Sequence, residues 1–240
     1  MEERVKEIIK KSNRIVFFGG AGVSTESNIP DFRSETGLYH AKEVYGVPPE
    51  TILSHTYFMN NTETFFKYYR ENLVYTSAKP NRAHMALSKL EEMGKLKAIA
   101  TQNIDGLHQM AGSKVVYELH GTIHKNHCMK CGEAYNLEYV LNEEGIPRCK
   151  KCGGIVKPDV VLYEESLDDR CIENTVNAIM NCDTLIIGGT SLNVYPAAGL
   201  IRYFRGDNLV LINKEETPYD SYANLVIHDK IGDVLDISNY

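Results

Sequence analysis

The sequence predicts an α/β fold in which a doubly wound parallel sheet carries a second, smaller domain. Short apolar segments alternate with stretches of helical periodicity along most of the chain, and each apolar segment turns polar at its C-terminal end. Strands that alternate with helices are typical of parallel sheets, and such sheets bind ligands beyond the carboxyl ends of their strands. Two Cys-x-x-Cys pairs interrupt this alternation and indicate a small module of a different kind.

The composition narrows the class of protein. The chain has 240 residues, 43% of them hydrophobic, which suits one large domain or a main domain with a small insertion. Its 26 basic and 32 acidic residues give a net charge of −6, without the basic stripe of a nucleic-acid binder. No apolar run approaches the roughly 20 residues that span a bilayer, and the N-terminus lacks the apolar core of a secretory signal. We therefore expect a cytoplasmic protein with no direct nucleic-acid or membrane partner, whose cysteines are thiols or metal ligands rather than disulfides.

The N-terminal part of the chain begins with an amphipathic surface helix over residues 2–12 and a buried strand over residues 14–18. Residues 34–75 are rich in aromatic residues and indicate a helical insertion with an aromatic core. Pro80-Asn81 starts a further helix that Gly94 ends. Three apolar side chains of this helix should face inward: Met85, Leu87 and Leu90.

Two further strands lead into polar residues and form the centre of the predicted site. The first covers residues 97–100 and leads into Thr101-Gln102-Asn103-Ile104-Asp105. The second covers residues 115–119 and leads into His120-Gly121. Because the carboxyl ends of neighbouring parallel strands share one rim of the sheet, these amide, carboxylate and imidazole groups should lie close together. The pattern therefore predicts a ligand site at this rim.

The C-terminal part continues the alternation of strands and helices. An extended segment covers residues 157–163, and a helix covers residues 168–182. Three buried strands follow, at residues 184–187, 209–212 and 225–227. Their polar ends are Gly188-Gly189-Thr190-Ser191, Asn213 and His228-Asp229. The first of these ends is suited to hydrogen-bonding a ribose or a phosphate.

The segment Gly19-Gly20-Ala21-Gly22 follows the first strand, in the position of a nucleotide-binding loop. Glycines let a backbone approach a phosphate closely. The dinucleotide-binding pattern is incomplete, because Thr25 stands where a third glycine is expected. A tight turn without function is therefore equally compatible with these residues. The next loop, Ile29-Pro30-Asp31-Phe32-Arg33, also allows two interpretations: a turn that buries Phe32, or a lid whose ring covers a heterocycle while Arg33 meets phosphate or holds Asp31.

Four cysteines have the spacing of a zinc site. Cys128 and Cys131 form one pair, and Cys149 and Cys152 form the other, with 17 residues between the pairs. Four thiolates close the tetrahedral shell of a zinc ion and leave no position for a substrate water, so the metal should be structural. The other interpretation, four reduced thiols in a loop, does not explain the spacing. Cys171 and Cys182 lack partners at such spacing and should be ordinary thiols.

In this order, the motifs resemble the sirtuins, the NAD-dependent protein-lysine deacylases, over nearly the whole chain. The motifs are Gly20-Ala21-Gly22-Val23-Ser24, Ile29-Pro30-Asp31-Phe32-Arg33, Thr101-Gln102-Asn103-Ile104-Asp105, His120-Gly121, the two cysteine pairs, Gly189-Thr190-Ser191-Leu192 with Val194 and Pro196, and Ile212-Asn213. The resemblance implies a Rossmann-like NAD-binding domain over residues 1–33, 76–123 and 158–240. Residues 34–75 and 124–157 would form the small domain, and NAD and an acyl-lysine peptide would meet between the two.

The resemblance also implies roles for single residues. His120 would act as general base on the ribose hydroxyls, a task suited to an imidazole with a pKa near ~6.5, and Asn103 would orient the ribose and a water. Phe32 would cover the nicotinamide site. The full set of residues expected to contact NAD is Gly20, Ala21, Gly22, Thr25, Phe32, Arg33, Gln102, Asn103, Ile104, Asp105, His120, Thr190, Ser191, Asn213, Asp229 and Ile231.

The resemblance places the acyl-lysine peptide beside Val160-Val161-Leu162-Tyr163, which would pair with its backbone, and beside Val194. The chain departs from the family at Tyr163-Glu164-Glu165, where Phe-Gly-Glu is common, and at Asn28, where glycine is usual. The helical insertion lacks the Tyr-x-x-Arg pair that binds acidic acyl groups in the desuccinylating branch. Short neutral acyl groups, acetyl above all, are therefore the expected substrates.

The resemblance thus implies a protein deacetylase that gives lysine, nicotinamide and O-acetyl-ADP-ribose. The compact length of the chain and its lack of tails suggest a monomer. Two alternatives stay open from the sequence. A mono-ADP-ribosyltransferase would use the same NAD site to modify a protein, and a non-catalytic NAD sensor would bind NAD without releasing nicotinamide. The presence of both Asn103 and His120 favours deacylation, because that reaction needs a base.

Overall fold

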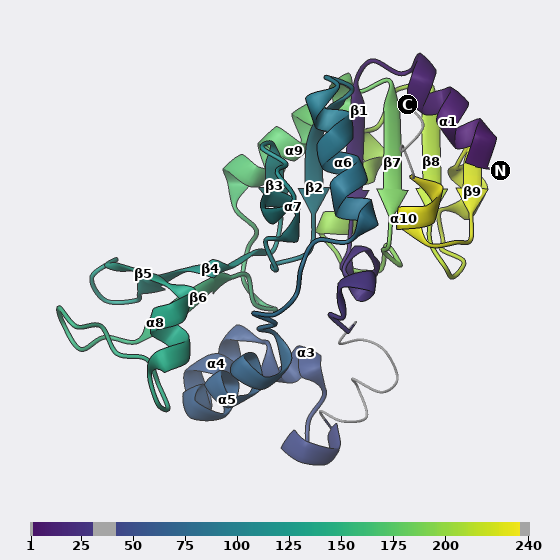
Figure 1. Cartoon of the computed structure of the whole chain (residues 1–240). Helices are drawn as coiled ribbons and strands as arrows, with labels where there is room; N and C mark the ends of the chain where they lie inside the picture. Colours follow the sequence, from purple (N-terminus) through teal and green to yellow (C-terminus); the bar gives the residue numbers. More distant parts are fainter. Residues whose placement is uncertain (1, 31–41, 236–240) are drawn as a thin grey trace.

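The computed structural model describes residues 2–30 and 42–235 and contains a six-stranded sheet, all of whose strands are parallel (Figure 1). The strand order is β3-β2-β1-β7-β8-β9. The strands are β1 (Ile15–Gly19), β2 (Leu96–Thr101), β3 (Val116–Glu118), β7 (Thr184–Gly188), β8 (Asn208–Ile212) and β9 (Leu225–Ile227). The predicted doubly wound parallel sheet is confirmed.

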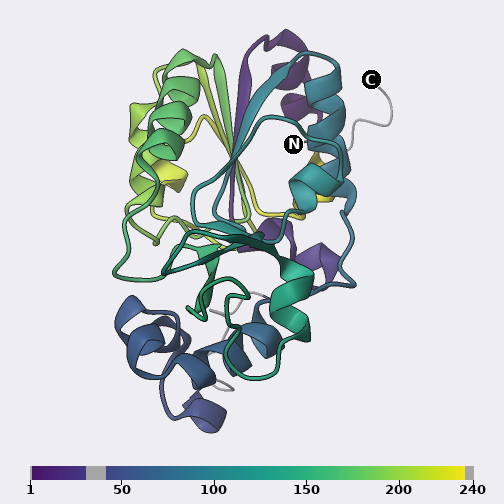
Figure 2. The ribbon, with the colours of Figure 1, turned by 90° about the vertical axis from the view of Figure 1, so that its left-hand side faces the viewer.

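Both faces of the sheet are buried. The central residues of its strands are apolar, whichever face they point to. In β1, Ile15 and Phe17 point to one hydrophobic core, and Val16 and Phe18 point to another. The first core is covered by α1 (Glu2–Lys11), α6 (Arg82–Glu92) and α10 (Ile231–Val234). The second is covered by α9 (Asp169–Asn181) and η3 (Ala197–Tyr203), and Figure 2 shows the two sets of helices on opposite sides. Shorter helical pieces are η1 (Ala21–Val23), η2 (Thr25–Ser27), α7 (Leu107–Met110) and η4 (Asp220–Tyr222).

The helix α6 begins and ends as its sequence predicts. Asn81 caps its N-terminus by accepting hydrogen bonds from the backbone N–H groups of Ala83 and His84, and Gly94 follows its end with a φ of +72°. The expectation that Met85 faces inward is wrong, because its side chain is 54% exposed. Leu87 and Leu90 are fully buried, so the inward stripe of the helix lies to one side of Met85. Among the residues that the structure describes, none of the helices is long and apolar enough to cross a membrane.

The smaller domain combines two segments that are distant in the sequence. One contributes the short helices α3 (Pro49–Ile52), α4 (His55–Asn60) and α5 (Thr62–Asn72). The other contributes α8 (Leu137–Asn142) and an antiparallel sheet of order β5-β4-β6, made of β4 (Gly121–Cys128), β5 (Ala134–Asn136) and β6 (Val156–Val160). Both segments pack around one core that includes Phe58, Phe65, Phe66 and Tyr69 of the helices (Figure 2). The aromatic core predicted for the insertion is present, and the expected domain limits at residues 123 and 157 fall inside β4 and β6.

Candidate functional site

Three loops meet at the carboxyl end of the parallel sheet, on the side that faces the small domain (Figure 1). They follow β1, β2 and β7, which are neighbours in the sheet. Gly19 at the end of β1 lies opposite Thr101 of β2 and opposite Gly188 of β7. The backbone N–H of Gln102 donates to the carbonyl oxygen of Gly19 at 3.0 Å. The sequence motifs at these three strand ends therefore come together in space.

The glycines after β1 allow the loops after β1 and β7 to pack closely. The N–H of Gly22 donates to the carbonyl oxygen of Gly189 at 2.8 Å. A Cβ atom at Gly22 would lie 2.7 Å from the Cα of Gly189, and one at Gly20 would lie 2.8 Å from the Cβ of Thr190. The sequence left two interpretations of these glycines open, contact with a phosphate and a tight turn without function. The structure shows that loop packing already requires them, and that the short turns η1 and η2 follow in place of a longer helix.

Ser24 joins the loop after β1 to the loop after β2, and the sequence interpretation missed it as a site residue. Its Oγ donates to Oδ2 of Asp105 at 2.6 Å and accepts from Nδ2 of Asn103 at 3.0 Å. Its side chain is 1% exposed, and the other carboxylate oxygen of Asp105 accepts from the N–H of Leu107. A hydroxyl placed directly after a glycine loop was the available signal. These bonds fix the orientation of both Asn103 and Asp105.

The imidazole of His120 is oriented by the loop after β2. Its Nδ1 lies 3.1 Å from the carbonyl oxygen of Gln102, which can only accept, so Nδ1 carries the proton. In the neutral ring, Nε2 then holds the lone pair and can take up a proton. Nε2 of the Gln102 side chain donates to Oγ1 of Thr190 at 3.0 Å, which links this arrangement to the loop after β7. The amide, carboxylate and imidazole groups expected at one rim lie in these connected loops.

Three of the residues expected to contact NAD follow the ends of β8 and β9: Asn213, Asp229 and Ile231. The N–H of Asn213 donates to the carbonyl oxygen of Ile227, and Nδ1 of His228 lies 3.0 Å from the carbonyl oxygen of Asn213. Asp229 is exposed. The side chain of Ile231 is buried in the core under the sheet, so only its backbone is available to a ligand.

Other residues expected to contact NAD lie in the segments that follow β1, β2 and β7. Ala21 and Thr25 are half-buried, and Oγ1 of Thr25 donates to the carbonyl oxygen of Gly22. Ser191 is exposed beside the buried Thr190. Ile104 packs against the core of the small domain. Phe32 and Arg33 lie outside the described residues.

The segment expected to bind the peptide, residues 160–163, connects β6 to the loop before α9. We refer to it as the 160–163 segment. Val160 and Leu162 are buried, and Val161 and Tyr163 are half-buried. The N–H groups of Val161, Leu162 and Tyr163 donate to the His120 carbonyl, the Glu165 carboxylate and the Leu53 carbonyl. Since these donors have partners within the chain, a paired peptide has to use carbonyl oxygens, each of which can accept two hydrogen bonds. Val194, in the loop after β7, is half-buried.

The four cysteines of the two pairs converge at the far end of β4. Their sulfur atoms all lie within 4.8 Å of one another, with 3.4 Å between Cys128 and Cys152 and 3.6 Å between Cys131 and Cys149. A tetrahedral zinc ion with Zn–S bonds of about 2.3 Å would hold such atoms about 3.8 Å apart, so the four cysteines are positioned to bind one zinc. The strand β4 runs from Gly121, beside His120, to Cys128. At roughly 3.3 Å per residue this separates the metal centre from His120 by about 23 Å.

Two buried histidines lie on the α6 side of the sheet. The rings of His84 in α6 and His108 in α7 have centroids 4.7 Å apart, and His108 is 1% exposed. Burial lowers the pKa of His84 to about 4, although the charge of Asp105 opposes this shift. Burial, and then the charge of His84, lowers the pKa of His108 to about 3. Both rings are therefore neutral near pH 7. Among the described residues, His84 Nε2 and both nitrogens of His108 have no hydrogen-bond partner.

Comparison with known proteins places this arrangement in a family. The family model described as the Sir2 family matches residues 20–196. A protein named NAD-dependent protein deacetylase from Clostridium acetobutylicum is 66% identical over 233 residues, which cover 97% of this chain and 95% of that protein. A solved Sir2 homolog–NAD complex is 34% identical with a TM-score of 0.88, and the match covers 98% of this chain and 91% of that one. The structure of Sir2Tm bound to a propionylated peptide is 33% identical with a TM-score of 0.86, over 97% of this chain and 94% of that one.

The family model covers well over half of the chain, and the similarity to solved members extends over nearly all of it. The large parallel sheet, the small domain and the four-cysteine cluster agree with that assignment. The chain belongs to the Sir2 family, the sirtuins.

Proposed function

We propose that the protein is an NAD-dependent protein deacetylase, which removes acetyl and other short neutral acyl groups from lysine side chains. The proposal rests above all on His120, whose Nδ1 donates to the carbonyl oxygen of Gln102 and leaves Nε2 as an oriented base. The name of the clostridial relative, at 66% identity over nearly the whole chain, supports the same reaction. The products would be the free lysine, nicotinamide and O-acetyl-ADP-ribose.

NAD would bind at the rim where the loops after β1, β2 and β7 meet. Gly20, Ala21 and Gly22 would offer their backbone to the pyrophosphate, and Thr190 and Ser191 would hold phosphate or ribose groups. When bound, NAD supplies the ADP-ribosyl group that accepts the acyl group. The remaining expected contacts are Thr25, Phe32, Arg33, Gln102, Asn103, Ile104, Asp105, His120, Asn213, Asp229 and the backbone of Ile231.

The protein itself would do two things in the reaction: orient the polar groups that contact the substrates, and accept one proton. Ser24 holds the amide of Asn103 and the carboxylate of Asp105 in fixed directions, so both are ready to receive polar groups of the substrate. Nε2 of His120 would take the proton of a ribose hydroxyl. Since its ring is already oriented by Gln102, little rearrangement would be needed at that step.

The acetyl-lysine side chain would enter beside the 160–163 segment and Val194. Val160 and Val161 offer apolar surface to the lysine stem, and the carbonyl oxygens of the segment would pair with the peptide backbone. The zinc ion would hold the small domain together without touching substrate. We retain 34–75 and 124–157 as the approximate extent of that domain. The free thiols favour a reducing compartment, so we propose a cytoplasmic protein, and we propose a monomer because both substrates have a place within one chain.

Mass spectrometry of an acetyl-lysine peptide incubated with the protein and NAD tests this function. Deacetylation predicts a peptide that loses its acetyl group only when NAD is present, together with O-acetyl-ADP-ribose in solution. A peptide or protein that instead gains an ADP-ribosyl group would identify a mono-ADP-ribosyltransferase. Saturable NAD binding without either product would identify an NAD sensor.

A further inference from the structure

We propose that Lys157 and Glu165 are positioning residues for the proposed deacetylation: together they hold the 160–163 segment in place for the acyl-lysine peptide. This inference rests on the proposed function, since it takes the 160–163 segment to be the peptide site. Neither residue would touch the reacting atoms. Their effect would be on peptide binding, through the backbone that they hold.

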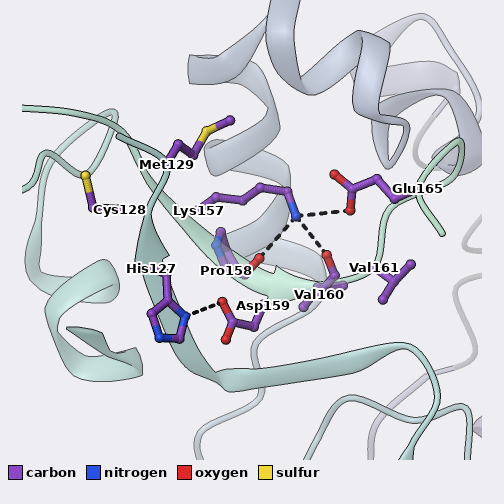
Figure 3. A pocket seen from close by; sticks show the side chains of 9 residues that line it. All are labelled: His127, Cys128, Met129, Lys157, Pro158, Asp159, Val160, Val161 and Glu165. Carbon is purple, nitrogen blue, oxygen red and sulfur yellow. Dashed lines mark hydrogen bonds and ion pairs between the residues drawn. The ribbon is translucent and has the colours of Figure 1, made fainter. Parts of the chain in front are cut away.

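Lys157 is anchored at three points. Its Nζ donates to Oε2 of Glu165 at 3.1 Å, to the carbonyl oxygen of Val160 at 3.0 Å and to that of Pro158 at 3.3 Å (Figure 3). Its side chain is only 17% exposed. The three protons of the ammonium group therefore all have acceptors, and one of those acceptors belongs to the first residue of the 160–163 segment.

Glu165 connects the same ion pair to the middle of the segment and to the helical insertion. Its Oε2 also accepts from the N–H of Leu162 at 2.9 Å, and its Oε1 lies 2.9 Å from Nδ1 of His55 at the start of α4. Burial acts to raise the pKa of this carboxyl, but the hydrogen bonds from His55 and Leu162 and the charge of Lys157 outweigh it and hold the pKa below its usual range. Glu165 is therefore ionised at neutral pH, and it can accept hydrogen bonds from both Lys157 and His55.

Glu164 adds a second link to the same helix. It has a φ of +73°, in the left-handed region that glycine adopts more readily than other residues. Its carboxylate accepts from the N–H of Thr56 at 2.8 Å. Next to it, Tyr163 donates to the carbonyl of Leu53 and accepts from the N–H of His55. Two successive glutamates thus reach the first turn of α4, and the C-terminal end of the segment is tied to the helical insertion.

The other end of this network lies at the proposed catalytic base. The N–H of Val161 donates to the carbonyl oxygen of His120 at 3.0 Å. Lys157 holds Val160 and Glu165 holds Leu162, so the residue that contacts His120 is fixed on both sides. The distance between the segment and the base therefore depends on the ion pair. No comparable contact joins Lys157 or Glu165 to the described loops after β1, β2 and β7, where NAD would bind.

Packing alone does not hold these two side chains. An open cavity of about 320 Å³ is lined by Lys157, Glu165, Val160 and Val161, among others (Figure 3). Burial removes water from the two charges of an ion pair, and this cost offsets much of their attraction. Apolar residues of similar volume at these positions would stabilise the fold at least as well. The ion pair instead orients the backbone of the 160–163 segment, since it holds the carbonyl of Val160 and the N–H of Leu162. This favours a role in positioning over a role in stability alone.

The test compares the KM for the acetyl-lysine peptide with the KM for NAD in the zinc-loaded 240-residue chain. Lys157→Met keeps the length of the side chain but removes its charge and donors. We expect it to raise KM for an acetyl-lysine peptide about 10-fold while KM for NAD changes by less than about 2-fold. Lys157→Arg, which retains charge and donors, should restore the peptide KM to within about 3-fold of the original. Lys89→Met, which breaks an exposed ion pair with Glu92 in α6, is the matched control and should change neither constant.

Several outcomes would overturn the inference. One is an unchanged peptide KM in Lys157→Met, and another is an equal rise of both constants. A failure of Lys157→Arg to rescue would also reject it, since a positioning role requires only the cation and its donors. Should Lys157→Met lose its zinc or its fold, Glu165→Gln, which keeps an amide oxygen for the Leu162 N–H, provides the same comparison. If the unaltered protein does not deacetylate the peptide, the proposed function itself fails, which is a separate result.

Discussion

The hydroxyl of Ser24 donates to Oδ2 of Asp105 at 2.6 Å, across 81 residues of sequence. The bond joins the loop after β1 to the loop after β2. The same hydroxyl oxygen accepts from the amide of Asn103, so one buried side chain orients two of the groups proposed to contact NAD. These bonds within the chain hold the rim of the sheet in a fixed arrangement, which lowers the entropy cost of binding a ligand there.

Replacement of Ser24 by alanine should weaken the use of NAD. The change leaves Asn103 and Asp105 without a shared partner, and an unmade hydrogen bond to a charged group costs about 1.5–3 kcal/mol. We expect kcat/KM for NAD to fall by about 10- to 100-fold. Steady-state kinetics at saturating peptide measures this, with the exposed Ser77→Ala as control. A Ser24→Ala protein with unaltered NAD kinetics would show that the bond does not orient the site.

Removal of zinc ligands should unfold the small domain. Substitution of both Cys128 and Cys152 by serine breaks a four-thiolate shell whose metal binding is coupled to folding. We expect elemental analysis to show a fall from one zinc per chain to none, and deacetylation to be lost. Cys171→Ser, which alters a half-buried thiol outside the cluster, should retain both. A double variant that is fully active without zinc would contradict a structural metal.

The buried histidines should make stability depend on pH. The pKa values of His84 and His108 are about 4 and about 3 in the folded protein, against 6.5 for an unperturbed histidine. Between these values the unfolded chain binds more protons than the folded one, so stability is full above about pH 6.5 and is lost as the pH falls toward the folded values. Each histidine contributes a slope of about 1.4 kcal/mol per pH unit in that window.

Urea denaturation between pH 5 and 7 measures this slope. His108→Leu removes one titrating group, and its free energy of unfolding should vary less steeply with pH than that of the unaltered protein. The difference should be about 1.4 kcal/mol per pH unit, whatever the offset in stability that repacking causes. Equal slopes for the two proteins would mean that folding does not lower the pKa of His108.

His120→Ala should separate NAD binding from the reaction. The imidazole is proposed as the base, while most of the proposed contacts with NAD come from other residues. We expect deacetylation to fall by about 10²- to 10⁴-fold, with NAD affinity changed far less. Isothermal titration with NAD and peptide assays on the same preparation provide the comparison. An active variant that has lost NAD affinity would contradict the role of a base.

The sequence predicted the elements whose signals are local. Strands such as residues 97–100 are short apolar runs that end on polar residues, and the four cysteines have a spacing that few other sites share. The helix α6 has a capping residue, Asn81, before its first turn and a glycine, Gly94, after its last, and both are visible in the sequence. The arrangement of the two domains was predicted from the resemblance to the sirtuins, because no single motif indicates it.

The features that were missed depend on contacts between distant segments. Met85 lies at the edge of the apolar stripe of its helix, so the sequence alone does not say which way it faces. The packing of α6 on the sheet leaves it exposed. Ser24 has no partner near it in sequence, since Asn103 and Asp105 lie in the loop that follows the neighbouring strand β2. The 160–163 segment has internal partners that are distant in the sequence, such as Leu53 and His120, so no local pattern predicts them.

The most direct test of the central claim is the rate of nicotinamide release from NAD, measured with and without an acetyl-lysine peptide while the peptide mass is followed in parallel. Deacetylation predicts that release requires the peptide and that one acetyl group is lost for each nicotinamide formed. Release at the same rate without peptide, or with the acetyl group intact, would contradict the account and would require a different role for His120.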